Sequence, residues 1–350
     1  MSERGTTTVA DELAHSIAAG ERWLLAHVDP EGAPAGDVGH SYRLPYTLVL
    51  LGRRQEAARV LAWMQREILT ANGDLAAGPM RAGFSERWSS YPLAIIAQAA
   101  WHLERYGLAH AILGRLRDFQ HPDHGGAFAE RPELRRTGRQ DLFPTAQLGM
   151  TAILTGNDDM AAGAFSWISE LYTLQPQLPE MLYSATDGEG ALLVDVPEPD
   201  DGGRERFGLI TDLRRPRQAF YNPGIAAAFL ARYADRYGSK EAAQLAGRYL
   251  ELTENATAQQ FDHRESVQVC KFGWGAANLY EVTGDVRFEA HAQRMARWFI
   301  EAQSPDGSWD NSPFLLPEGP TTGSRLEVTA EFVQHQIVIA TALATGARDA

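Results

Sequence analysis

The sequence predicts an all-α protein in which six helical hairpins form an (α/α)6 toroid, a ring of inner helices inside a ring of outer helices. Three observations predict this fold. Amphipathic stretches alternate with more apolar stretches along the chain, the apolar stretches share the same residues at their ends, and one short turn motif recurs after the amphipathic stretches. Units that recur along a chain in this way are the signature of a repeat architecture.

The amphipathic stretches are expected to form the outer helices. Their apolar residues recur at steps of three and four, which places those side chains on one face of a helix. In the last stretch Phe288, Ala292, Met295 and Phe299 share such a face. A helix with a single apolar face needs only that face covered. The six predicted outer helices span residues 11–28, 55–69, 109–119, 159–172, 240–255 and 286–302.

The more apolar stretches are expected inside, because a helix that is apolar all round has to be buried. Proline lies near the start of four of them, where its missing N–H costs nothing, at Pro45, Pro92, Pro144 and Pro223. Glycine follows all six, as the left-handed C′ position prefers, at Gly52, Gly107, Gly156, Gly238, Gly284 and Gly346. The six predicted inner helices span residues 41–51, 91–106, 143–155, 223–237, 272–283 and 328–345. Whether the hairpins close into a ring or form an open solenoid stays open.

One domain is expected over residues 1–350, with a disordered N-terminus at 1–10. The irregular segment 176–222 is too long for an ordinary connection, and it contains an acidic piece followed by a basic one. We interpret it as a lid over one end of the toroid, the alternative being a plain surface excursion. Residues 313–325 are a second, shorter candidate.

The turn motif is most complete at residues 303–309, Gln-Ser-Pro-Asp-Gly-Ser-Trp. Proline presets φ and glycine tolerates positive φ, so the chain is expected to reverse here. Residues 120–128, Gln-His-Pro-Asp-His-Gly-Gly-Ala-Phe, form a close copy. Weaker copies are Asp29-Pro-Glu-Gly, Ala71-Asn-Gly-Asp and Asp187-Gly-Glu-Gly.

The pattern Gln303-x-x-Asp306-Gly307-x-Trp309 resembles the Gln/Trp repeat of the terpenoid cyclase (squalene-hopene cyclase) and protein prenyltransferase superfamily. The resemblance implies an α/α toroid with a central, aromatic-lined cavity. The catalytic motifs of the superfamily are absent. No Asp-x-Asp-Asp is present, since residues 198–201 read Glu-Pro-Asp-Asp in a loop. Cys270 lies in Val-Cys-Lys-Phe, without the zinc pattern of the prenyltransferases.

Composition excludes several classes of protein. With 44% hydrophobic residues and a net charge of -13, the chain is an ordinary soluble protein without the basic surface that nucleic acid or an anionic membrane requires. The single cysteine, Cys270, excludes an internal disulfide and any cysteine-rich zinc site. The N-terminus lacks the apolar region of a signal peptide, so we expect a cytoplasmic protein. The oligomeric state is unknown.

A toroid brings the N-terminal ends of its inner helices together at one mouth, and each predicted inner helix supplies polar or aromatic residues there. We expect the catalytic residues among Glu331, Asp141, His40, His335 and Tyr221. We expect the substrate-binding residues to include Tyr42, Arg43, Glu86, Trp88, Tyr91, Phe143, Lys271, Trp274 and Arg215. Glu331 and His335 stand out, because they lie four residues apart on one face of a buried helix, where a carboxylate is costly unless paired or functional.

Purely structural roles compete with these assignments. A carboxylate at Asp141 or Glu86 could complement a helix dipole, and Trp88, Phe143 or Trp274 could simply fill the core. His121 and His124 flank a turn without a third metal ligand, so we expect a solvated loop. Nucleotide-binding, metalloprotease and serine-hydrolase motifs are missing. We therefore expect neither a cofactor nor a metal.

Three functions remain open. The first is a cofactor-independent cyclase, isomerase or lyase, of a kind found in secondary metabolism, that uses acid/base chemistry on a largely apolar, isoprenoid- or polyketide-like small molecule. In it Glu331 or Asp141 would be the acid, with its pKa raised, and Arg43 or Lys271 would hold an anionic group. The second is a carbohydrate-active glycosidase, lyase or epimerase, since toroids also present paired acids to sugars. The third is a non-catalytic binding protein.

Overall fold

The structure, a computed structural model, describes residues 8–195, 204–216, 218–254, 269–310 and 318–346. Its elements in chain order are α1 Val9–Ala26, η1 Val38–His40, α2 Leu44–Leu50, α3 Arg54–Glu67, η2 Pro79–Arg81, α4 Phe84–Arg87, α5 Ser90–His102, α6 Tyr106–Phe119, β1 Ala127–Phe128, η3 Pro132–Leu134, β2 Gln140–Asp141, α7 Leu142–Thr155, α8 Asp158–Thr173, β3 Met181–Tyr183, β4 Ala185–Thr186, α9 Arg204–Leu209, β5 Ile210–Asp212, α10 Tyr221–Tyr237, α11 Lys240–Glu254, α13 Cys270–Thr283, α14 Val286–Ala302 and α15 Thr322–Thr345. Of the predicted disordered N-terminus at 1–10, residues 1–7 lie outside the described residues, whereas Thr8 caps α1 and the next two residues belong to this helix, so the prediction was wrong there.

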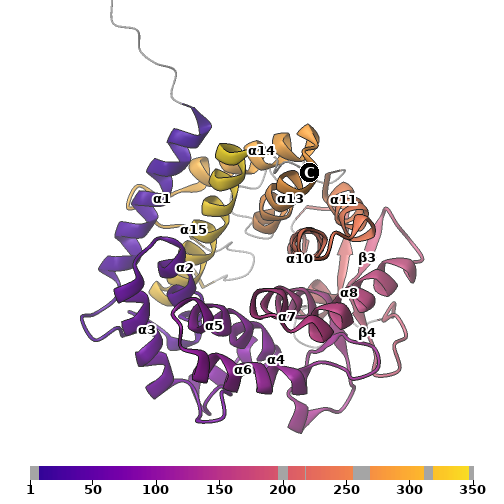
Figure 1. Cartoon of the computed structure of the whole chain (residues 1–350), viewed down its shortest axis with the longest axis horizontal. Helices are drawn as coiled ribbons and strands as arrows, with labels where there is room; N and C mark the ends of the chain where they lie inside the picture. The colour runs from indigo at the N-terminus through magenta and orange to yellow at the C-terminus, as the bar shows by residue number, and fades with distance from the viewer. Residues whose placement is uncertain (1–7, 196–203, 217, 255–268, 311–317, 347–350) are drawn as a thin grey trace, which may run out of the picture.

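Two concentric rings of helices form a toroid (Figure 1). Each of the inner helices α2, α5, α7, α10, α13 and α15 packs against the next, and α15 packs against α2, so the ring is closed. The outer helices α1, α3, α6, α8, α11 and α14 surround them. The predicted α/α toroid is confirmed, and the open solenoid is excluded.

The two ends of the chain form one of the six pairs, because the first helix, α1, packs on the last, α15. The seam between α15 and α2 is polar. The Thr47 hydroxyl lies 3.0 Å from the Ala330 carbonyl oxygen, and Gln334 donates to Thr47 over 2.7 Å. These bonds join residues almost 300 positions apart in the chain and hold the ring closed.

Most of the predicted helix ends are confirmed. The four prolines lie in the first turns of α2, α5, α7 and α10, and Gly156, Gly238 and Gly284 are left-handed caps. Gly107 was predicted wrongly. The helix α5 ends at His102, the residue with positive φ is Glu104, and Gly107 already lies inside α6. Residues 103–105 contain neither glycine nor proline, so the sequence has no turn residue at the observed end of α5.

The recurrent turns share one backbone geometry. These turns begin at residues 29, 70, 187 and 304. In each, the backbone N–H of the first residue donates to the carbonyl oxygen of the residue four positions later, and its own carbonyl oxygen accepts from the N–H of the residue three positions later. In three of these turns the left-handed glycine, Gly32, Gly73 or Gly307, lies against an outer helix, whereas Gly190 lies against His124. A Cβ atom at Gly73 would lie 2.5 Å from the Ala111 carbonyl carbon of α6, and one at Gly307 2.5 Å from the Ala19 oxygen of α1. Only glycine fits this combination of positive φ and close contact.

The glutamines of the two strongest copies tie each turn to a neighbouring outer helix. Gln303 Nε2 donates to Gly307 O in its own turn and to Ser16 O on α1, over 2.9 and 3.0 Å. Gln120 Nε2 donates in the same way to Gly125 O and to Met160 O on α8, both over 2.9 Å. The repeat therefore has a structural role, since it fastens consecutive outer helices together.

The segment 176–222 contains more regular structure than predicted. Strand β4 extends a small sheet of order β1-β2-β4, and β3 pairs with β5 in a second sheet. Ser184 lies between these strands. Its oxygen accepts from Leu142 N at the start of α7, and its hydroxyl accepts from Asn222 at the start of α10. The segment thus packs at the end of the ring where the inner helices begin.

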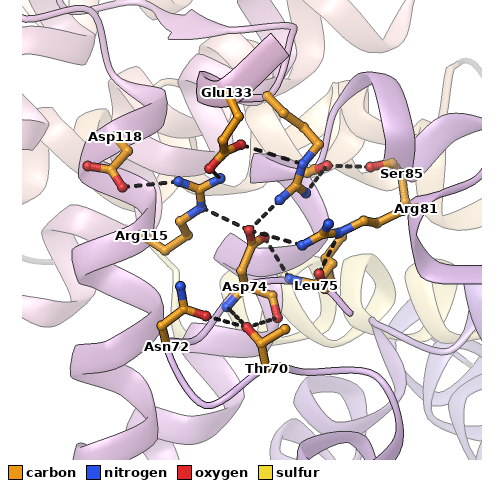
Figure 2. A network of polar contacts seen from close by, with 11 residues as sticks. Thr70, Asn72, Asp74, Leu75, Arg81, Ser85, Arg115, Asp118 and Glu133 are labelled. Atoms are coloured by element: carbon orange, nitrogen blue, oxygen red, sulfur yellow. Dashed lines mark hydrogen bonds and ion pairs between the residues drawn. The ribbon is translucent and has the colours of Figure 1, made fainter. Parts of the chain in front are cut away.

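A buried network of charges connects the turn after α3 to the loops before α5 and α7. Figure 2 shows Asp74 facing Arg81 and Arg115, whose Nη2 and Nε atoms lie 3.4 and 3.1 Å from Asp74 Oδ2. Arg131 also pairs with this oxygen and donates to Ser89, which precedes α5. The arginines share Glu133 and Asp118 as further partners (Figure 2). Sequence analysis did not identify this network, which is structural in character.

Candidate functional site

Six side chains, one from each inner helix or its first cap, form a closed circuit. Arg43 contacts Tyr91, Tyr91 packs on Phe143, Phe143 on Tyr221, Tyr221 on Lys271, Lys271 pairs with Glu331, and Glu331 pairs with Arg43. We call these residues the six-residue circuit. Five of them lie at the N-cap or in the first turn of their helices, whereas Glu331 lies farther along α15, which begins at Thr322, before the predicted start at residue 328. All six were predicted as site residues, and their roles stay a prediction.

The charged half of the circuit consists of Arg43, Lys271 and Glu331. Lys271 Nζ lies 2.5 Å and Arg43 Nη2 3.1 Å from the same oxygen, Glu331 Oε1. Arg43 also donates to the Tyr91 hydroxyl over 2.9 Å. The three charged side chains are buried, with 5 to 8% of their surface exposed. Two buried cations therefore share one carboxylate.

Glu331 does not have the raised pKa that the sequence predicted for a catalytic acid. Burial alone would raise the pKa, but Arg43 and Lys271 outweigh it and lower the pKa of Glu331 to about 2. An acid with this pKa is ionised near neutrality and has no proton to give. In the structure Glu331 is the counter-ion of Arg43 and Lys271, and its role in catalysis stays a prediction.

The aromatic half of the circuit continues outward. The ring centroids of Tyr91 and Phe143 lie 5.1 Å apart, and those of Phe143 and Tyr221 5.7 Å apart. Trp88 and Phe84 pack on Phe143 at 5.3 and 5.9 Å. Phe84 is 41% exposed, which is unusual for a phenylalanine in a folded core. The aromatic faces therefore reach from the buried circuit to the solvent.

A second acid/base group lies next to the circuit, where η1 and α2 meet α15. Glu327 accepts from the Tyr42 hydroxyl through one oxygen and binds His40 Nδ1 through the other, both over 2.5 Å. This hydrogen bond raises the pKa of His40. Tyr42 packs edge-on against Tyr91, which connects the pair to the circuit. The geometry suits His40 as a proton donor that Glu327 orients.

His335 lies one turn beyond Glu331 on α15, stacked on Trp274 with ring centroids 5.0 Å apart. Burial lowers the pKa of His335 to about 3, so the imidazole is neutral near pH 7. Its Nε2 lies 4.0 Å from Glu331 Oε1, and its Nδ1 is buried without a hydrogen-bond partner within the part of the chain that is described. A neutral imidazole is the form that accepts a proton, but a pKa of about 3 makes His335 a weak base near neutrality unless the neighbouring Glu331 carboxylate stabilises the charged ring.

Asp141 lies at the opposite side of the aromatic rings, just before α7. Trp88 Nε1 donates to Asp141 Oδ2 over 2.6 Å, and Arg139 Nε lies 3.0 Å from Oδ1. The carboxylate is 3% exposed. These contacts hold the Trp88 ring against the six-residue circuit. In the structure Asp141 therefore positions an aromatic side chain.

One trio of potential metal ligands occurs among the described residues. Ligand atoms of Cys270, Glu331 and His335 lie within 4.8 Å of one another. The Lys271 ammonium already occupies this place, 2.5 Å from Glu331 Oε1 and 3.9 Å from Cys270 Sγ. Burial raises the pKa of the Cys270 thiol to about 12, which keeps the thiolate form scarce. The donor set does not fit a resident metal ion as long as Lys271 is charged.

Two predicted substrate-binding residues lie away from the circuit. Arg215 is exposed and pairs with Asp212 on its own segment, at 3.2 Å, as Arg214 also does at 3.4 Å. Glu86 is exposed on the short helix α4. Residue 217, a further arginine of the basic piece, lies outside the described residues. Arg214 and Arg215 thus pair within their own segment.

Two residues that the geometry brings to the site, Glu327 and Phe84, were not among the predicted site residues. Glu327 lies four positions before Glu331, so the helical period could have found it. Phe84 is the first residue of the four-residue helix α4, and so short a helix has no periodic pattern that identifies it.

Comparison with known proteins supports the fold. No protein-family model matches the sequence, and no curated protein sequence matches it significantly. Among solved structures, a variant of the type II terpene cyclase MstE from Scytonema, in complex with its substrate geranylgeranyl dihydroxybenzoate, is similar with a TM-score of 0.55 and 14% identity. The match covers 96% of this chain and 99% of the cyclase.

Two carbohydrate enzymes are similar as well. A D-mannose isomerase matches with a TM-score of 0.66 and 11% identity over 94% of this chain and 97% of the isomerase. A family 76 glycoside hydrolase from a bovine Bacteroides thetaiotaomicron strain matches with a TM-score of 0.53 and 10% identity over 94% and 78%. At these identities the likeness establishes the toroid fold alone, in agreement with the resemblance in the turn motif. None of the described helices combines the length and the apolarity needed to cross a bilayer.

Proposed function

We propose that this protein is a cofactor-independent enzyme, a cyclase, isomerase or lyase, that performs acid/base chemistry on a largely apolar isoprenoid- or polyketide-like small molecule. The observation that carries the proposal is the six-residue circuit with the His40–Glu327 pair beside it. A purely structural ring would not need two cations, a carboxylate and two histidines with displaced pKa values at one level. The substrate would lie at the end of the ring where the inner helices begin.

The proposed role of each titratable group follows from its protonation state near neutral pH. His40, whose pKa is raised, would donate the proton. His335, neutral and with a free ring nitrogen, would accept one. Glu331 would hold the cations in place, and the Tyr221 hydroxyl, whose pKa burial raises, would act as a neutral hydrogen-bond donor. This division gives the proton transfers to histidines and leaves the two buried carboxylates, Glu331 and Asp141, as positioning groups.

The apolar part of the substrate would pack on Phe84, Trp88, Phe143 and Trp274. Flat aromatic faces exclude water and stabilise developing positive charge through their π electrons. The terpene cyclase MstE, which shares this fold, binds a prenylated aromatic acid. The segment 176–222 would close over this end as a lid, since it already packs on the first turns of α7 and α10.

The second candidate is a carbohydrate enzyme, an epimerase or isomerase before a glycosidase. Two histidines, His335 on α15 and His40 paired with Glu327 of the same helix, suit the removal and return of a proton at a sugar carbon. The D-mannose isomerase of the same fold supports this alternative. A non-catalytic binding protein is the third candidate, and it predicts ligand binding without turnover.

Proton transfer to substrate carbon can be detected without knowing the product. The protein would be incubated in D2O with geranylgeranyl dihydroxybenzoate, D-mannose and, separately, p-nitrophenyl glycosides, and the products analysed by mass spectrometry. Deuterium gained by the prenylated acid supports the first function, and deuterium gained by the sugar supports the second.

The variants His40→Gln and His335→Gln should each abolish the deuterium gain, whereas His110→Gln, on the outer helix α6, should retain it. Turnover that survives in both histidine variants would remove the proposed mechanism. Binding of a compound without isotope exchange in any assay would favour the binding protein. Release of nitrophenol would favour a glycosidase instead.

A further inference from the structure

The charged half of the circuit has more positive charge and more hydrogen-bond donors than its own residues use. Arg43 and Lys271 carry one positive charge each, and within the described residues Glu331 is the one carboxylate that pairs with both. His335 stacks alongside on Trp274 and adds no negative charge. The centre therefore has one buried positive charge in excess, in a chain whose net charge is -13.

The donors that remain belong to side chains that are more than nine-tenths buried. Arg43 is 5% exposed, and its Nε has no hydrogen-bond partner in the described part of the protein. Lys271 is 7% exposed and directs one of its three protons to Glu331 and a second toward Cys270 Sγ, at 3.9 Å, which leaves one proton to donate. Tyr91 accepts from Arg43 at its oxygen and keeps its own proton to donate. A buried donor without a partner is costly, so an acceptor that satisfies these groups would bind with a gain.

We propose that Arg43 and Lys271 form a subsite for a single carboxylate on a flat, apolar body, that is, for an aromatic acid. This inference rests on the proposed position of the substrate and specifies its chemical class. The flat body follows from Tyr91, Phe143 and Tyr221, which continue the circuit directly from the two cations.

Charge balance selects a carboxylate over a phosphate. A monoanion would neutralise the excess of one positive charge. A phosphate dianion would leave a buried negative charge instead, next to the carboxylate of Glu331, and an uncompensated buried charge is strongly unfavourable. The planar guanidinium of Arg43 also matches the geometry of a carboxylate.

Three probes test the subsite on the full chain by isothermal titration calorimetry near pH 7. Benzoate has the charge and the flat body, benzamide has the same shape without the charge, and inorganic phosphate has the charge without the body. We expect benzoate to bind at least tenfold more tightly than benzamide and than phosphate. Equal binding of benzoate and benzamide would overturn the proposal. Tighter binding of phosphate would overturn the assignment to a carboxylate.

Variants at Lys271 locate the binding. Lys271→Met should weaken the binding of benzoate at least tenfold. This variant should still fold, because Arg43 and Glu331 remain as a pair of opposite charges. Lys271→Arg should keep most of the affinity. Lys240→Met, which removes an exposed lysine at the start of α11, should leave binding unchanged. Benzoate affinity that survives Lys271→Met would place the ligand elsewhere and refute the subsite.

This test is independent of catalysis. Benzoate that binds in the expected way, while no deuterium enters any substrate, would leave the subsite standing and remove the proposed enzyme activity. Turnover by a protein that binds benzoate no more tightly than benzamide would leave the enzyme activity standing and remove the subsite.

Discussion

Lys271 Nζ lies 2.5 Å from Glu331 Oε1, and this contact joins two inner helices, α13 and α15. Both residues are buried. Removing Glu331 would leave Lys271 and Arg43 without a counter-charge in a medium of low polarity, whereas removing Lys271 would leave Glu331 paired with Arg43. The pair determines which protonation states the site can use. It keeps Glu331 ionised, and it places an ammonium between Glu331 and Cys270.

Removing the carboxylate should destabilise the protein strongly. Glu331→Gln leaves two buried cations, Arg43 and Lys271, without a counter-charge, and loss of one member of a buried pair typically costs about 3–5 kcal/mol. The free energy of unfolding in urea measures the effect. Glu86→Gln, which changes an exposed carboxylate on α4, should stay within about 0.5 kcal/mol of the unchanged protein. Equal urea midpoints for Glu331→Gln and the unchanged protein would show that the two cations are not confined as described.

The same carboxylate should make stability depend on pH in the acid range. Its folded pKa of about 2 lies below the ordinary value of 4.5, so its contribution is complete above about pH 4.5 and is lost as the pH falls toward 2. The difference in stability between the unchanged protein and Glu331→Gln should therefore shrink over this interval. Urea unfolding at pH 5, 4, 3 and 2.5 tests this, and a constant difference would contradict the lowered pKa.

The pKa of His40 should depend on Glu327. The hydrogen bond to Glu327 raises it above the ordinary 6.5, so the contribution of this pair to stability is present below about pH 6.5 and lost as the pH rises through the raised value. In Glu327→Gln, burial remains and the carboxylate is gone, so the pKa of His40 should fall below 6.5. NMR titration of the His40 ring proton measures both values. Tyr42→Phe serves as the control, because it removes a donor to Glu327 and keeps the charge.

Removing Lys271 should convert its surroundings into a metal site. Without the ammonium, Cys270, Glu331 and His335 present one soft and two harder ligands within 4.8 Å of one another, a set that suits Zn²⁺ with an open position. Zinc should bind to Lys271→Ala at least tenfold more tightly than to the unchanged protein in calorimetry. Adding Cys270→Ser to this variant should abolish the gain. If the unchanged protein binds zinc as tightly as Lys271→Ala, then Lys271 does not exclude the metal.

The glutamine of the turn motif should matter for stability and not for the site. Gln303→Ala removes two hydrogen bonds, to Gly307 O and to Ser16 O, at a cost of about 1–3 kcal/mol. Thermal unfolding measures this loss, and Gln65→Ala on the exposed side of α3 is the matched control. Benzoate affinity should be unchanged in both variants. A large loss of affinity in Gln303→Ala would mean that the outer ring and the circuit are coupled.

The sequence by itself determined the helices and their order. Local physics carries this information, because the three-and-four spacing in residues 286–302, the proline in the first turn at Pro223 and the left-handed glycine at Gly238 all act within a few residues of one another. It also placed Arg43, Tyr91, Phe143, Tyr221 and Lys271 near the starts of their helices, where a toroid makes them neighbours, whereas Glu331 lies farther along α15 than the predicted start at residue 328 implied.

Only the tertiary structure decided how these residues pair, because pairing depends on contacts between positions far apart in the chain. The ring closes through the hydrogen bond from the Thr47 hydroxyl to the Ala330 carbonyl oxygen and through the packing of α1 on α15. The protonation of Glu331 was set by Arg43, 288 positions away in the chain, and by Lys271, so a carboxylate that looked like an acid in the sequence became a counter-ion in the fold. The charge state of a buried group depends on all the groups that surround it, and the sequence alone does not show which groups those are.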